Sequence, residues 1–164
     1  GERWQLDRVQ MAPKPSQQPR IPIWLGTGSP VGLARAARIA DGWIGAGASS
    51  SADFGRQAQV VREALEDAGR DPTDFTIAKR AYVVVDDNMQ RARRAMRRWT
   101  SCLYGDEAIG DRVAITGDIP SCADQLADLV VAGADRLVLN PVTDLEEQLE
   151  AIGQVRDSLT VGLT

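Results

Sequence analysis

Short apolar runs separated by longer amphipathic stretches make up most of the chain. The apolar runs fall at 21–25, 43–46, 75–85 and 136–140. None of them alternates apolar with polar positions, which is typical of strands buried on both faces. Helical periodicity fills the stretches 30–40, 52–68, 88–103, 121–132 and 144–159. The pattern therefore predicts four strands alternating with helices, an α/β protein with a parallel sheet.

Capping and turn residues indicate where the predicted helices begin. Ser29 followed by Pro30 predicts a helix N-cap with proline at the first helical position. Ser121 is predicted to cap the helix that runs to residue 132. The Gly- and Asp-rich stretch 104–120 is predicted to be a loop that holds a short helix. The chain thus repeats a unit of strand, loop and helix.

The length of the chain limits how these units can fold. Residues 1–20 are polar and contain three prolines, which predicts a linker or loop. Residues 21–164 hold about four strand–helix units, whereas a complete (β/α)₈ barrel takes about 250 residues. A partial TIM barrel and a small open, doubly wound sheet both fit this pattern. Because the chain opens with Gly1 in place of Met, we expect a fragment or a processed product.

Composition excludes several classes of function. The net charge of −4 argues against a nucleic-acid surface, and no apolar run approaches the roughly 20 residues that span a bilayer. The absence of histidine excludes His-ligated metals and Ser-His-Asp hydrolysis. Two cysteines outside any CxxC pair predict reduced, cytoplasmic thiols. We therefore expect a cytoplasmic protein without a metal, nucleic-acid or membrane partner.

The junction after the first predicted strand, residues 26–29, is the first candidate site. A strand that ends in two glycines beside a capped helix leaves several backbone N–H groups without partners. Such a junction suits an anion, because Gly26 and Gly28 let a phosphate approach the backbone and the Ser29 hydroxyl can donate. The alternative interpretation is a junction that only turns the chain.

A second loop of small residues, 46–51, follows the next predicted strand. Loops after parallel strands open at the same edge of the sheet, so the two loops are predicted to form one phosphate pocket. The alternative is a flexible Ser/Gly turn without a ligand.

The first junction also resembles a variant of the dinucleotide-binding fingerprint. Its glycines are Gly26, Gly28 and Gly32. That fingerprint needs an acidic residue at the end of the next strand to bind the ribose. Small residues stand there instead, so the dinucleotide interpretation is disfavoured.

Three stretches together form a recognisable pattern. They are 22–29 (PIWLGTGS), 36–43 (AARIADGW) and 133–141 (GADRLVLNP). These stretches resemble the C-terminal half of the luciferase-like monooxygenase family, and the similarity runs from about residue 6 to residue 159. The resemblance implies that residues 21–164 are about four βα units of a TIM barrel, from its fifth strand to its eighth.

The resemblance also implies an oxidoreductase or monooxygenase that acts on a small molecule with FMN or the deazaflavin coenzyme F420. The implied phosphate-binding residues are Gly26, Thr27, Gly28, Ser29, Ala46, Gly47, Ala48 and Ser49. Some F420-using members carry a basic residue in the second loop, where this chain has Ser49, so both cofactors stay open. The family's ring-contacting and most of its catalytic residues lie in the N-terminal half, so this fragment alone is expected to be inactive.

Two polar residues at strand positions are candidates for substrate contact. Arg80 in the third predicted strand and Asn140 at the end of the fourth could face the barrel mouth, where strand-end groups often meet substrate. The alternative for Arg80 is an ion pair with a neighbouring carboxylate. The alternative for Asn140 is a turn residue before Pro141.

Two functions from different classes fit the sequence. The first is half of a flavin- or F420-dependent enzyme that needs its missing N-terminal half-barrel. The second is a non-catalytic half-barrel that binds a phosphate ligand or none and self-associates, because four strands leave open sheet edges and an apolar interior. Upstream sequence that encodes four further strands would favour the enzyme.

Overall fold

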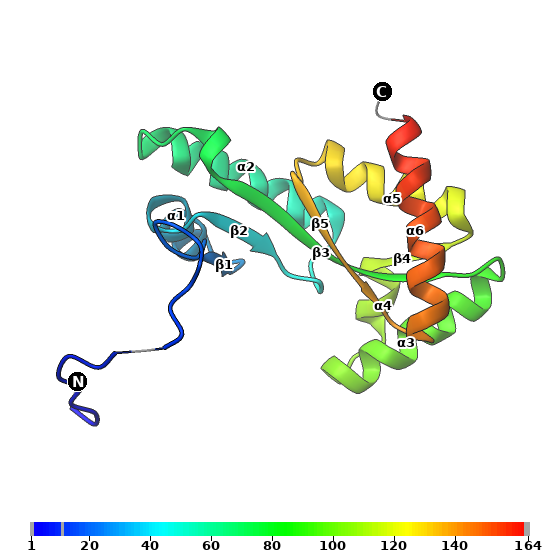
Figure 1. The fold of residues 1–164 in the computed structure, drawn as a ribbon. Helices are drawn as coiled ribbons and strands as arrows, with labels where there is room; N and C mark the ends of the chain where they lie inside the picture. The colour runs from blue at the N-terminus through cyan, green and yellow to red at the C-terminus, as the bar shows by residue number, and fades with distance from the viewer. Residues whose placement is uncertain (1, 11, 163–164) are drawn as a thin grey trace.

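The computed structural model describes residues 2–10 and 12–162. The strands are β1 (Trp24–Gly26), β2 (Gly42–Gly45), β3 (Thr76–Val85), β4 (Ala114–Gly117) and β5 (Arg136–Pro141). The helices are α1 (Pro30–Ile39), α2 (Ser51–Asp67), α3 (Met89–Tyr104), α4 (Ala108–Val113), α5 (Ile119–Val131) and α6 (Leu145–Gly162), with a 3₁₀ turn at Pro72–Asp74. The described part of the segment before residue 24 forms neither helix nor strand and extends away from the sheet (Figure 1).

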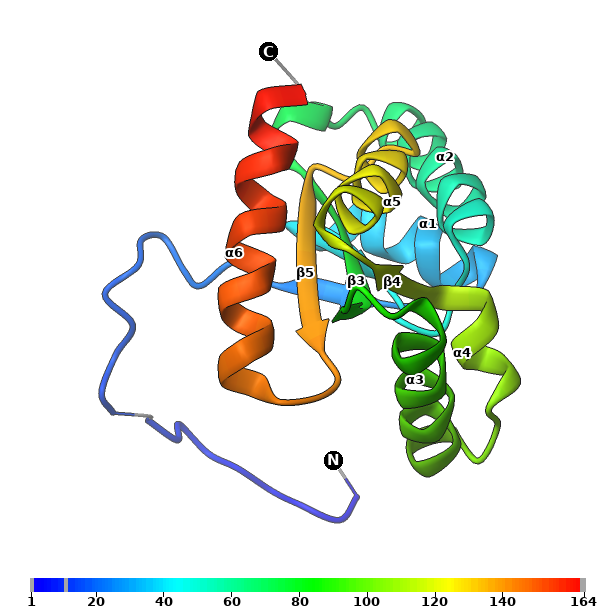
Figure 2. The ribbon, with the colours of Figure 1, turned by 90° about the vertical axis from the view of Figure 1, so that its right-hand side faces the viewer.

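All pairings in the five-stranded sheet are parallel, and β3 lies at its centre. Ala78 and Lys79 pair with both β2 and β5, so these two strands lie on opposite edges of β3. Tyr82 and Val83 pair with both β4 and β5, so β4 continues the edge that β2 begins. Figure 2 shows β5 between β3 and α6. The predicted α/β fold with a parallel sheet is confirmed.

The fifth strand is a difference from the sequence prediction. The stretch 104–120 was predicted as a loop with a short helix, and α4 lies there, but the stretch also contains β4. Four residues are too few to give a clear pattern of their own. The strand forms because β3 is ten residues long and its last four residues, Tyr82–Val85, offer a free edge to Ala114–Gly117.

The two faces of β3 carry different kinds of residue. Ile77, Ala81 and Val83 point toward the helices and join the main core, to which α1, α2, α5 and α6 all contribute. Trp43 and Phe54 are fully buried in this core, with stacked rings whose centroids are 5.5 Å apart. The other face carries Tyr82 and Val84, which pack against Ala92 and Met96 of α3 in a second, smaller core.

One predicted helix cap is confirmed and one is wrong. Ser29 caps α1, and its hydroxyl accepts a hydrogen bond from the Gly32 N–H at 3.2 Å. Ser121, however, lies inside the first turn of α5. Asp118 is the N-cap there, and its carboxylate accepts from the Ser121 N–H at 3.0 Å. Asp and Ser cap helices about equally well, so residue type alone did not separate the two positions.

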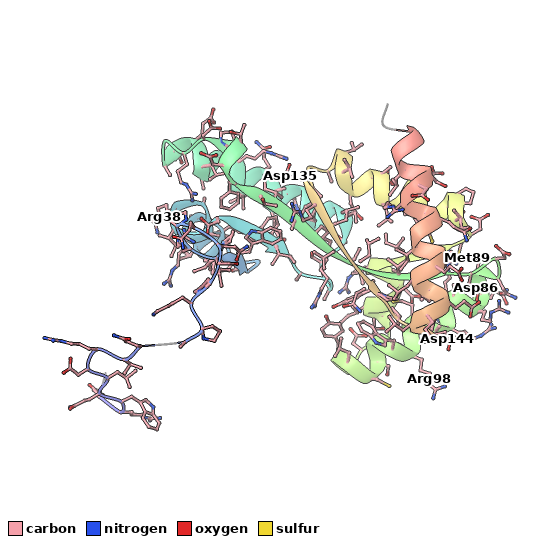
Figure 3. All side chains as sticks on the ribbon, viewed as in Figure 1. Arg38, Asp86, Met89, Arg98, Asp135 and Asp144 are labelled. Carbon is pink, nitrogen blue, oxygen red and sulfur yellow. The ribbon has the colours of Figure 1, made fainter. Side chains whose placement is uncertain are left out.

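Two aspartates secure the amino-terminal edge of the sheet. Asp41 accepts from the Ile23 N–H at 2.6 Å and binds the guanidinium of Arg20 through both oxygens. Asp135 accepts from the Ile77 N–H at 2.7 Å. Figure 3 shows Asp135 at the opposite end of β3 from Asp86, which follows the strand. The amino ends of the strands are therefore occupied by structural contacts, and a candidate site is expected at the carboxyl ends.

In the described ranges, no helix is both long enough and apolar enough to cross a membrane.

Candidate cofactor site at the carboxyl edge of the sheet

A cavity of about 310 Å³ lies where β1 and β2 end. It is lined by Gly26, Thr27, Gly28, Ile44, Gly45, Ala46 and Arg80. Five of these seven residues were singled out from the sequence. Ser29, Gly47, Ala48, Ser49 and Asn140 do not line the cavity. The structure thus brings residues 26–28, the start of the second loop and Arg80 together around the cavity. The other predicted site residues do not line it.

The first loop, residues 27–29, is fixed mainly by its neighbours in sequence. The Thr27 carbonyl accepts from the indole N–H of Trp43 at 2.8 Å. The hydroxyl oxygens of Thr27 and Ser29 lie 3.5 Å apart. Within the described ranges, the N–H groups of Gly28 and Val31 have no protein acceptor. The loop therefore offers hydroxyls and unpaired N–H donors at a helix N-terminus, where the helix dipole favours negative charge.

Neither backbone strain nor crowding by the protein requires glycine in the first loop. Neither Gly26 nor Gly28 has a φ in the left-handed region. A Cβ on Gly26 would lie 3.7 Å from Ile44, an ordinary contact, and one on Gly28 would lie 3.1 Å from the flexible amide of Gln57. The fold thus tolerates side chains at both positions. Without side chains, these two positions leave the backbone open to close approach.

The second loop, residues 46–49, forms a tight turn. The N–H and the hydroxyl of Ser49 both donate to the Ala46 carbonyl, at 3.1 and 2.7 Å. Gly47 is required by packing, because a Cβ there would lie 2.3 Å from Cζ of Tyr82. The loop leads into α2, whose N-cap Ser50 accepts from the Asp53 N–H.

Lys79 is a site residue that the sequence analysis did not identify. Its side chain leaves the helix-facing side of β3 and is only 3% exposed. The ammonium donates to the carbonyls of Ala46 and Ser49 and to the Ser49 hydroxyl. Burial, aided by the nearby Arg80 charge, lowers the pKa of Lys79 from its ordinary 10.5 to about 8. A lysine inside a mainly apolar strand, in a chain with one other lysine, is the signal that could have revealed it.

Arg80 lies on the opposite face of β3 and reaches the cavity. Its guanidinium donates to the Tyr82 hydroxyl at 2.7 Å, which in turn shares a hydrogen bond with the Tyr104 hydroxyl. Burial, with the Tyr104 contact, raises the pKa of Tyr82 to about 12, so the phenol keeps its proton. No carboxylate of the described residues pairs with Arg80, so the ion-pair alternative is wrong.

Asn140 occupies a strand and not a turn. It lies in β5 in register with Tyr82, on the same face of the sheet. Its side-chain amide donates to the Pro141 carbonyl at 3.3 Å. The turn alternative is therefore wrong, and Asn140 lies outside the cavity lined by the loops.

These features define an α/β partial barrel with an anion-suited cavity at its carboxyl edge. The sequence profile of the family described as luciferase-like monooxygenase matches residues 1–112. The chain therefore belongs to the luciferase-like monooxygenase family, as its resemblance predicted.

Curated relatives match a shorter stretch. A phthiodiolone/phenolphthiodiolone dimycocerosates ketoreductase of Mycobacterium tuberculosis is 32% identical over 74 residues, which are 45% of this chain and 19% of the relative. The same figures hold for the ketoreductase of Mycobacterium bovis. The chain thus spans about a fifth of the length of the curated relatives it matches.

Solved structures match nearly the whole chain. An F420-dependent secondary alcohol dehydrogenase, in complex with an F420–acetone adduct, has a TM-score of 0.79 at 17% identity, over 94% of this chain and 53% of its own. A monooxygenase from Streptomyces bottropensis has a TM-score of 0.71 at 18% identity, over 95% and 52%. The F420-dependent tetrahydromethanopterin reductase of Methanopyrus kandleri has a TM-score of 0.68 at 20% identity, over 82% of this chain and 49% of its own. The fold is thus that of about half of each neighbour, consistent with a partial barrel.

Proposed function

We propose that this chain supplies the cofactor-phosphate side of a luciferase-like oxidoreductase that uses coenzyme F420 or FMN. The observation that carries the proposal is the cavity in which the first loop, Ala46 and Arg80 converge. Residues 21–164 are then the C-terminal half of the barrel, and residues 1–20 lead into it. The dinucleotide alternative lacks its acidic residue, because Ala46 lines the cavity at the end of β2.

The groups around the cavity suit a phosphate. The unpaired N–H of Gly28 can donate to a phosphate oxygen, and the hydroxyl of Thr27 can donate as well. Arg80 adds a positive charge that no carboxylate of the described chain neutralises. Charge-assisted hydrogen bonds of this kind are about twice as strong as neutral ones. We expect all eight loop residues to shape the site, with Ser29 and Gly47–Ser49 acting through the loop conformation.

When bound, the cofactor would supply hydride transfer or oxygen activation, and the protein would supply placement. Arg80 lines the cavity, so it can orient an anionic or carbonyl-bearing group, and the buried Tyr82 hydroxyl holds its guanidinium. Tyr82 keeps its proton at neutral pH and can only donate or accept a hydrogen bond there.

We place the enzyme in the cytoplasm, because Cys102 and Cys122 are both free.

The face of the sheet opposite the main core, here called the inner face, is covered by α3 around Tyr82 and Val84. The outer edges of β1 and β5 are unpaired among the described strands, and Val138 on the inner face of β5 is 38% exposed. We propose that the remaining half of the barrel covers the rest of this face, because the structural neighbours are about twice as long as the chain. Without that half, the chain would be catalytically inactive and would self-associate. Light scattering of the isolated chain at micromolar concentration tests this, and a stable monomer would contradict it.

The choice between cofactors is tested by titrating coenzyme F420 and FMN separately into the purified full-length protein. We expect micromolar or tighter binding of one of them, with a perturbed visible absorption spectrum. Binding of neither, or of a nicotinamide dinucleotide alone, would overturn the proposal. A non-catalytic phosphate-binding module would bind inorganic phosphate without any preference for either cofactor.

A further inference from the structure

Lys79 is a buried cation without an acidic partner. No carboxylate of the described residues lies within ion-pair distance of its ammonium, and the side chain is 3% exposed. Taking an ammonium out of water is costly unless its donors are satisfied. An apolar side chain in the same place would avoid that cost, so the charge calls for an explanation beyond packing.

All three donors of the ammonium go to one loop. They reach the carbonyl of Ala46, the carbonyl of Ser49 at 2.8 Å and the Ser49 hydroxyl at 2.9 Å. The Ser49 hydroxyl at the same time donates to the Ala46 carbonyl, so ammonium, hydroxyl and carbonyl form a closed network. One end of this network, Ala46, lines the cavity. A residue of the neighbouring strand thus sets the shape of the second loop.

Few charged groups face this ammonium. From α2, Asp53 raises the pKa of Lys79, and it is already bound by Ser50 and Arg56. The neighbouring Arg80 lowers it, as does burial. From α2 the Phe54 ring also faces Lys79, with its centroid 5.9 Å from Nζ. The positive charge of Lys79 is therefore weakly compensated, and it stands behind a loop whose other side faces the anion-suited cavity.

We propose that Lys79 is the positioning residue of the second cofactor loop, holding residues 46–49 in the shape that receives the anionic group of the cofactor. The inference rests on the proposed function. Lys79 does not touch the ligand. It fixes the Ala46 and Ser49 carbonyls away from the cavity and adds a positive potential beneath the loop.

The first experiment needs no cofactor. Hydrogen exchange of the Ser49 amide, which donates to the Ala46 carbonyl, reports the shape of the loop. In Lys79→Met we expect this amide to exchange at least about tenfold faster, while amides of α6 stay unchanged. The matched control is Lys14→Met, because Lys14 is exposed and is the only other lysine of the chain. Unchanged exchange in Lys79→Met would overturn the proposal whatever the cofactor does.

The second experiment measures affinity for coenzyme F420, FMN and inorganic phosphate from pH 7 to 9.5. At pH 7 we expect the wild type to bind about tenfold more tightly than Lys79→Met, which is the size of one charge-assisted hydrogen bond. This ratio of affinities should fall as the pH rises through about 8, where Lys79 loses its proton. Lys79→Arg, if it folds, keeps the charge and should show no such fall. Cys122 and Tyr82 titrate near 11 and 12, outside this window.

A third readout requires no variant. Protein labelled with ¹³C at lysine Cε gives one signal for each lysine, those of Lys14 and Lys79 among them. Bound anion should raise the titration midpoint of Lys79 and leave Lys14 unmoved. If anion binding shifts the amide signal of Gly28 but not the titration midpoint of Lys79, the positioning role of Lys79 is wrong. The proposed phosphate site at the first loop is then still supported. If no probe binds the wild type, the proposed function fails, and fast Ser49 exchange in Lys79→Met would then mark Lys79 as structural only.

Discussion

The two loops at the carboxyl edge of the sheet are built in different ways. The first is held by groups close in sequence or on the adjacent strand, namely the Ser29 cap and the Trp43 indole. The second is held from β3, by Lys79 on one face and by the Tyr82 ring against Gly47 on the other. A local loop keeps its shape when β3 changes, whereas a loop fixed by a distant strand depends on that strand's side chains and on their protonation.

Gly28→Val should give the largest effect, confined to the first loop. A Cβ at this position meets only the mobile end of Gln57, so the fold should persist, but the valine side chain fills the approach to the backbone. Losing two or three charge-assisted hydrogen bonds of about 1.5 kcal/mol each weakens cofactor binding by about three orders of magnitude. Calorimetric titration measures this. Gly153→Val in α6, where no neighbouring atom lies within 4 Å of a Cβ, is the control, and equal affinity in both would show that Gly28 only turns the chain.

The pH dependence of stability probes the anchor of the second loop. Lys79 has a pKa of about 8 in the fold and 10.5 ordinarily, so between these values the unfolded chain binds more protons. The free energy of unfolding of the wild type should therefore rise from pH 8 to 10.5, by up to about 3 kcal/mol relative to Lys79→Met. Urea unfolding at several pH values measures the difference between the two proteins. A flat difference would mean that Lys79 is solvated, and a difference that falls with pH would mean that the fold raises its pKa.

Gly47→Ala tests the other contact of the second loop. Its Cβ would lie 2.3 Å from Cζ of the fully buried Tyr82, whose ring also packs edge-on against Trp99. Overpacking of this kind costs about 1–3 kcal/mol, measurable by urea unfolding. Gly26→Ala is the control, because its Cβ makes an ordinary contact. In a Tyr82→Leu background, adding Gly47→Ala should cost much less than it does in the wild type. A Gly47→Ala protein as stable as the wild type would refute the packing argument.

Asn140→Asp should have the smallest effect. The change removes one long hydrogen bond to the Pro141 carbonyl in β5, and Asn140 does not line the cavity. We expect cofactor affinity and turnover of the full-length protein to change less than about threefold, a small part of the 1–3 kcal/mol that a lost substrate contact costs. A larger fall in turnover with unchanged cofactor affinity would make Asn140 a substrate contact after all.

The comparison of the loops also explains what the sequence could predict. Ser29-Pro30 and the glycines before them form a local pattern, so the first loop was recognisable. Lys79 follows the second loop by 30 positions, and its role depends on the pairing of β2 with β3. No local sequence pattern predicts that β2 pairs with β3. The short β4 was missed for the same reason, because it exists only beside the far end of β3.

The phrases that reveal the family are mainly structural. AARIADGW contains Asp41 and GADRLVLNP contains Asp135, and both carboxylates accept strand N–H groups at the amino edge, opposite the site. Their role is structural, because each carboxylate supplies an acceptor to a backbone N–H at the amino end of a strand. They say nothing about which cofactor binds, so the family was readable from the sequence and the choice between FMN and coenzyme F420 was not.

The most direct test of the central claim is a crystal structure of the full-length protein with whichever of coenzyme F420 and FMN binds. The account predicts the cofactor phosphate within hydrogen-bond distance, about 3 Å, of the Gly28 N–H, with Ala46 on its other side and Lys79 still bound to the second loop. A phosphate held elsewhere, with residues 26–28 contacting only protein or solvent, would contradict it.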